Sequence, residues 1–127
     1  MKALVLAAAA AMAMAGGASA QAPAVARSVA ERMDIPGNQE AVLGGASFPS
    51  GSDTGLHVHH GLELLTVTEG SLEVAIQGRP TATMKPGDQM IIPRETPHSA
   101  KNVGAAPAKA VITWVVDKGK PMSDPVK

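Results

Sequence analysis

The sequence contains no cysteine and no tyrosine, and it has a single phenylalanine and a single tryptophan, Phe48 and Trp114. Without cysteine the protein has neither disulfide bonds nor thiol chemistry. So few aromatic rings leave little material for a platform that stacks nucleic-acid bases. The missing tyrosine also removes a phenol that could serve as a general acid.

An excess of charge of one sign is lacking as well. Eleven lysines and arginines balance eleven aspartates and glutamates, which gives a formal net charge of +0. A chain balanced in this way offers no strongly basic surface to nucleic acid or to an anionic membrane. We therefore expect neither as a partner.

Long apolar runs are confined to the N-terminus. Lys2 precedes an uncharged apolar run over residues 3–15, and Ala18-Ser19-Ala20 has the small-residue form of a cleavage site. The run is shorter than the roughly 20 residues of a membrane span, so we interpret residues 1–20 as a signal peptide. The mature protein is expected to be periplasmic or secreted, with no membrane attachment after cleavage.

The remaining chain has the length of one small domain with a single core. Residues 21–26 are small and are expected to form a flexible leader. Residues 27–118 are expected to form the folded domain. Residues 119–127 contain two prolines and are expected to be an irregular tail.

Short segments with strand character fill this domain. Residues 72–77 alternate between apolar and other side chains, residues 109–116 are rich in β-branched residues, and residues 28–33 suit an edge strand. Turn signals recur every eight to ten residues, and no long stretch has a helical period. The pattern predicts an all-β domain, either a sandwich or a barrel.

Three of the four histidines lie between Gly51 and Gly70. His57 and His59 are two residues apart, so in a strand both side chains point to the same face. Glu63 follows closely, and a metal ion would need at least one more ligand. The only histidine outside this stretch is His98.

Two spaced motifs resemble those of the cupins. The first runs Gly51, five residues, His57-x-His59, three residues, Glu63, six residues, Gly70. The second runs Gly87, five residues, Pro93-x-Glu95, two residues, His98, three residues, Asn102. The second motif departs from the family pattern at Glu95, where glycine is usual. The chain is also similar to the small exported bacterial cupins that have one domain behind a signal peptide.

The resemblance implies a small β-barrel, the double-stranded β-helix of jelly-roll type. It also implies a metal held by His57, His59, Glu63 and His98, with Glu63 either a ligand or a catalytic base beside the metal. Three imidazoles and one carboxylate suit Fe, Mn, Ni, Cu or Zn as a divalent ion better than Mg or Ca. Octahedral coordination would leave two open positions, whereas tetrahedral zinc would be closed and structural.

The residues around these ligands are expected to have other roles. A regular strand would turn His60 away from His59, which places it at the rim or surface, where it could contact substrate. Asn102 is expected in a turn at the barrel wall. If the usual glycine has a positive φ, then Glu95 is strained or its turn differs. Leu65 and Val67 are expected to face inward, and the expected pocket walls are Phe48, Met90, Ile92 and Trp114.

Three functions remain open at this stage. The first is a mononuclear metal-dependent oxidoreductase, similar to the quercetin-dioxygenase-like cupins, that acts on a small organic molecule. The second is a non-catalytic periplasmic protein that binds a metal or a small ligand, and the third is an interaction domain with a structural zinc site. Small cupins often form dimers, and an exposed edge strand needs cover, so a homodimer is expected.

Overall fold

The computed structural model describes residues 22–127. The predicted signal peptide, residues 1–20, lies outside the described residues. Within the described part the chain forms strands joined by turns and loops, with no helix that has the length and hydropathy of a membrane span. The strands are β1 (Ala26–Ile35), β2 (Gln39–Phe48), β3 (His57–Val58), β4 (Gly61–Glu69), β5 (Leu72–Ile76), β6 (Ala82–Met84), β7 (Gln89–Ile92), β8 (His98–Lys101), β9 (Ala108–Asp117) and β10 (Asp124–Pro125).

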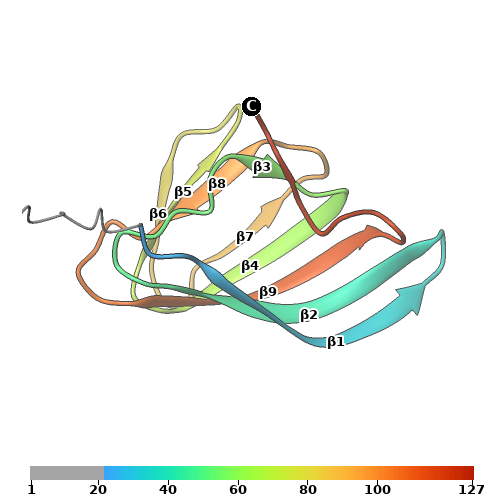
Figure 1. The fold of residues 1–127 in the computed structure, drawn as a ribbon, viewed down its shortest axis with the longest axis horizontal. Helices are drawn as coiled ribbons and strands as arrows, with labels where there is room; N and C mark the ends of the chain where they lie inside the picture. The colour runs from blue at the N-terminus through green and yellow to red at the C-terminus, as the bar shows by residue number, and fades with distance from the viewer. Residues whose placement is uncertain (1–21) are drawn as a thin grey trace, which may run out of the picture.

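The strands make two sheets that face each other (Figure 1). The larger sheet has the order β1-β2-β9-β4-β7, and the smaller has the order β10-β3-β8-β5-β6. All pairings between these strands are antiparallel, and chain neighbours such as β3 and β4 lie in different sheets. This is the all-β jelly-roll arrangement that the sequence predicts.

Side-chain alternation places the core between the sheets. Along β9 every second residue from Ala108 to Val116 is buried, and β5 buries Leu72, Val74 and Ile76. Leu65 and Val67 of β4 are buried as predicted. The facing apolar surfaces therefore hold the two sheets together and form the walls of an interior space.

The ends of the domain differ from the prediction in two places. Ala26, assigned to the leader, is the first residue of β1, and Val25 packs against the core. The tail predicted to be irregular contains β10, which pairs with β3. Pairing with another strand orders both segments: β1 pairs with the next strand, β2, and β10 pairs with the distant strand β3.

The outer face of the larger sheet carries a row of exposed apolar side chains. Leu43, Leu64 and Ile91 are exposed and lie in one cross-strand row with Thr113, which runs over β2, β9, β4 and β7. β1 forms the edge of this sheet, and nine of its ten residues are exposed.

Candidate metal centre

Four buried side chains meet where the two sheets face each other. His57, His59 and His98 come from the smaller sheet and the loop that follows β3, whereas Glu63 comes from β4 of the larger sheet. Each of the four residues is 6% exposed or less. One potential ligand atom from each lies within 4.8 Å of the others, close to the roughly 4 Å span of donors around a transition metal.

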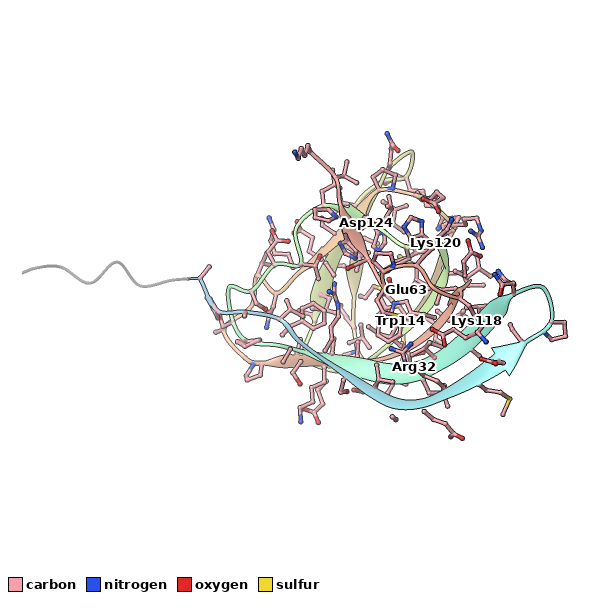
Figure 2. The ribbon with its side chains drawn as sticks, turned by 45° about the vertical axis from the view of Figure 1, so that its right-hand side comes forward. Arg32, Glu63, Trp114, Lys118, Lys120 and Asp124 are labelled. Carbon is pink, nitrogen blue, oxygen red and sulfur yellow. The ribbon has the colours of Figure 1, made fainter. Side chains whose placement is uncertain are left out.

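Strand register explains why residues far apart in sequence converge. His57 is paired directly with His98 across β3 and β8, and their ring centroids are 4.2 Å apart. His59 follows after one residue and faces the same interior, with its ring 4.9 Å from that of His57. Glu63 is the register partner of Trp114, and Figure 2 shows these two residues close together inside the barrel.

The proton on each imidazole is fixed by a backbone carbonyl. Nδ1 lies 2.8 Å from the Gly55 oxygen in His57 and 2.8 Å from the Thr96 oxygen in His98. In His59 it lies 2.6 Å from the Met122 oxygen. A carbonyl oxygen only accepts hydrogen bonds, so Nδ1 is the protonated nitrogen in each ring and Nε2 of the neutral ring has a free lone pair.

The lone pairs of His59 and His98 face the carboxylate of Glu63. A cation stabilises an arrangement of this kind. Nε2 of His59 is 2.6 Å from Oε2 of Glu63, and Nε2 of His98 is 3.2 Å from the same oxygen. Two acceptors at such distances repel each other unless a proton or a metal ion lies between them. The residues present therefore fit a divalent transition metal, and backbone carbonyls orient its imidazole ligands.

The charge states also suit a metal. Burial disfavours the charged form of Glu63, but in the metal-free site a proton on Nε2 of His59 or His98 makes a hydrogen bond to the carboxylate, and these bonds outweigh burial and lower the pKa of Glu63 to about 2. Burial lowers the pKa of His57 to about 4, against the hydrogen bond to Gly55 and with the help of nearby positive groups that include Arg27. At neutral pH the site thus offers an anionic carboxylate and a neutral imidazole.

A small cavity adjoins the four residues and encloses about 20 Å³, which is room for little more than one water molecule. Phe48, Leu65, Ile92 and Trp114 line it, as the sequence predicts for Phe48, Ile92 and Trp114. Met90 was predicted as a wall but packs against the core instead and does not line this cavity.

Arg27 and Thr54 also line the cavity, and sequence reasoning missed both. Arg27 is the one exposed residue of the lining, and among residues 22–127 no ion pair involves it. It lies on β1 opposite Ala46, outside either motif, so no spacing in the sequence points to it.

His60 does not reach the cavity and is not free at the surface. Its Nδ1 lies 2.7 Å from Glu95 and its Nε2 lies 2.6 Å from Asp124. The hydrogen bond to Glu95, followed by that to Asp124, raises the pKa of His60. Glu95 has a φ of 54°, the positive value that explains why glycine is usual at this position.

Asn102 has the structural role that was predicted. Its buried side chain donates hydrogen bonds to the carbonyls of Phe48 and Ala106 and accepts one from the amide of Gly104. It thereby closes the turn after β8 and holds it against the end of β2.

Comparisons with known proteins bear on this geometry. The sequence profile of the family described as "Cupin domain" matches residues 46–116, which is more than half of the chain. An uncharacterised conserved protein with a double-stranded β-helix domain from Klebsiella pneumoniae is similar in structure. It has 26% identity and a TM-score of 0.64 over 76% of this chain and 80% of that one.

Two similar structures are of named enzymes. An oxalate oxidase in complex with the substrate analogue glycolate has 26% identity and a TM-score of 0.55 over 58% of this chain and 41% of that one. A DMSP lyase from Ruegeria pomeroyi has 22% identity and a TM-score of 0.63 over 68% of this chain, a likeness of fold alone. The chain spans 43% and 44% of the length of the two DMSP lyases that it matches. No curated protein sequence matches the chain.

Proposed function

The chain belongs to the cupin family, and we propose that it is a mononuclear metal-dependent oxidoreductase of the dioxygenase-like kind that acts on a small organic molecule. The observation that carries the proposal is the buried convergence of His57, His59, Glu63 and His98. Its donor set suits Fe, Mn, Ni, Cu or Zn as a divalent ion. Such a metal, when bound, supplies Lewis-acid or redox chemistry.

Within this proposal Glu63 has two roles. Its carboxylate is an anionic ligand, and it is also the group that we propose for proton transfer, because it is the one carboxylate among the residues that line the cavity. The three imidazoles hold their Nδ1 protons against carbonyl oxygens, so they are ligands and not proton donors to a substrate.

The size of the cavity and the position of Arg27 narrow the substrate class. A space of about 20 Å³ is too small for a flavonol unless the walls move, but it suits the reacting end of a small acid. The Arg27 guanidinium at the exposed end offers two parallel donors to a carboxylate. The glycolate-bound oxalate oxidase, a partial structural relative, supports a small carboxylate as the substrate.

The test begins with the metal content of protein purified from the exported fraction, because cytoplasmic overproduction can load a different metal. Oxygen consumption is then measured with small hydroxy and oxo acids, enediols and flavonols. We expect turnover of a small acid, with a raised KM in Arg27→Gln and little change in the control Arg79→Gln, whose side chain donates to the Ile91 carbonyl and does not line the cavity. Fully loaded protein that turns over none of these compounds would contradict the enzyme proposal.

A second candidate is a non-catalytic protein that binds a metal or a small ligand. The hydrogen bonds of His60 favour it, because both ring nitrogens are bonded to carboxylates, and besides Glu63, Arg27 and the three imidazoles no titratable side chain of residues 22–127 lines the cavity. In this case small carboxylates would raise the Tm of the metal-loaded protein without any product.

Location and assembly complete the proposal. We propose export to the periplasm or medium, based on the signal-peptide pattern of residues 1–20, and N-terminal sequencing of the mature protein would test cleavage before Gln21. We also propose a homodimer, supported by the exposed β1 edge and the apolar outer row of Leu43, Leu64 and Ile91.

A further inference from the structure

The C-terminal segment, residues 121–127, pairs with β3, the strand that carries the proposed metal ligand His57. Asp124 and Pro125 pair with Val58 and His57 as β10 and β3, and the amide of Val126 donates to the carbonyl of Leu56 at 3.0 Å. This segment follows β9 of the larger sheet but pairs with β3 of the smaller one, so it crosses from one sheet to the other (Figure 1).

One contact of this segment is made directly with a metal-ligand side chain. The carbonyl of Met122 accepts the Nδ1 proton of His59 at 2.6 Å, while the side chain of Met122 packs against the core. The other two imidazoles take their carbonyls from nearby residues, Gly55 and Thr96, two positions before each histidine. His59 alone depends on a segment 63 residues away.

A second contact joins the same segment to two of the motif residues. His60 is enclosed, at 16% side-chain exposure, between the carboxylates of Asp124 and Glu95. Both ring nitrogens face oxygens that only accept, so an imidazolium bridges the two carboxylates. Glu95 reaches His60 from a backbone with a φ of 54°, and its amide also donates to the carbonyl of His59. The unusual residue in the second motif is therefore built into this contact.

We propose that residues 121–127 form a C-terminal latch, fastened by the Glu95–His60–Asp124 bridge, whose Met122 carbonyl is the positioning group for the metal ligand His59. The latch sets which nitrogen of His59 carries the proton and which way the ring faces. It does so from outside the cavity, because none of its residues lines that space. This inference rests on the metal centre of the proposed function, but not on any reaction there.

The test compares the full chain with a chain that ends at Lys120, with cobalt(II) as the probe. Loss of a hydrogen-bond partner behind a metal-binding imidazole costs about 10- to 100-fold in metal affinity, and we expect a weakening in that range. The visible spectrum of bound cobalt should also change, because His59 is no longer held. Equal dissociation constants and identical spectra for the two chains would overturn the proposal.

Two single substitutions keep the test independent of the truncation. Asp124→Ala and Glu95→Gly each remove one carboxylate from His60, and glycine accepts the backbone conformation of Glu95 without strain. In both variants we expect faster hydrogen exchange over residues 121–127 of the metal-free protein. The matched control is Ser123→Ala, since Ser123 lies in the same segment and its side chain makes no hydrogen bond among residues 22–127. Exchange that is unchanged in both carboxylate variants would contradict the latch.

Failure of the underlying proposal has a different signature. A full chain that takes up no cobalt contradicts the metal centre and, with it, the positioning of His59. A full chain that binds cobalt but turns over no substrate contradicts only the oxidoreductase, and the affinity comparison still decides the role of the latch.

Discussion

Single atoms decide the chemistry of the metal centre. Glu63 is buried, yet in the metal-free site its pKa is about 2, because hydrogen bonds from protonated Nε2 of His59 and His98 outweigh the cost of burial. Its oxygen lies 2.6 Å from Nε2 of His59, a distance that a shared cation makes favourable. The carboxylate is therefore the one negative charge that this candidate site would offer a divalent ion in an otherwise neutral set of donors.

This role predicts a specific loss in Glu63→Gln. The amide is neutral and a weaker donor, so metal affinity should fall by at least about 10-fold, the lower end of the effect of outer-shell changes. The metal-to-protein ratio, measured by elemental analysis after dialysis, should drop accordingly. Glu73→Gln on β5 removes the same charge away from the cavity and should retain the metal. Equal metal retention by both variants would exclude Glu63 as a ligand.

The identity of the four residues could be predicted from sequence, but their protonation could not. The spacing of the two motifs identifies His57, His59, Glu63 and His98 as one set. The alternation of side chains along a strand and the pairing register of a barrel leave few ways to arrange these four residues. The carbonyls that orient the imidazoles belong to Gly55, Thr96 and Met122, and any residue type supplies a carbonyl. These hydrogen-bond partners are determined by the backbone geometry, so the residue types in the sequence do not predict them.

At the level of elements, the glycines of two turns allow the cost of backbone strain to be measured apart from the cost of a steric clash. Gly70 directly follows β4 and has a φ of +66°, and an added Cβ would lie 2.6 Å from the carbonyl oxygen of Pro107. Gly78, after β5, has a φ of +83° and nothing within 4 Å. We expect Gly78→Ala to cost about 1 kcal/mol of unfolding free energy, from backbone strain alone.

Gly70→Ala should cost clearly more, about 2–4 kcal/mol, because overpacking adds to the strain. Urea unfolding of the two variants measures the difference. Similar losses would mean that the β8–β9 loop moves aside and that the fit at Gly70 is not tight.

The ion pair between Arg94 and Asp117 makes the stability of the fold depend on pH. The two guanidinium hydrogen bonds from Arg94 to Asp117, 2.7 and 2.9 Å long, hold the pKa of Asp117 well below its usual value of 3.8. A carboxylate whose folded pKa is depressed adds stability above its unfolded pKa and loses it as the pH falls. Asp117→Asn should therefore lower the Tm slightly at pH 7, and this deficit should shrink as the pH falls below about 4. Thermal melts across this range check it, and a deficit that is independent of pH would refute it.

Local pattern predicted some elements much better than others. The β-branched run of residues 109–116 lies within β9, where burial on alternate positions matches the composition. β10 has only two residues, one of them proline, and owes its existence to β3. A strand that forms only by pairing with a distant partner need not show an alternating pattern in its own sequence. The tail was therefore predicted to be irregular.

For the whole molecule, the uncovered surface of the larger sheet carries the proposed assembly. The apolar row across β2, β9, β4 and β7 includes Ile91, which is 55% exposed. In the proposed dimer, Ile91→Lys would place an unpaired charge in the interface and shift the protein to monomers. Thr83→Lys, an exposed position on the smaller sheet, is the control. Light scattering after size exclusion measures the mass, and the same mass for all three proteins would place any interface elsewhere.

The overall architecture followed from sequence because strands such as β4, β5 and β9 alternate buried and less buried residues, and two motifs gave the order of the site residues. The position of Arg27 did not follow, since it depends on how β1 lies along β2 and where the cavity opens. Both are properties of the assembled sheets.

Trp114 gives this protein an intrinsic optical reporter. It is the only tryptophan, the chain has no tyrosine, and its ring centroid lies 6.3 Å from that of His59. Emission excited in the near ultraviolet therefore comes from one buried indole beside the metal ligands. Paramagnetic ions such as copper(II) should quench it as they load, whereas zinc(II) should not, so a titration without any label can follow occupancy of the site.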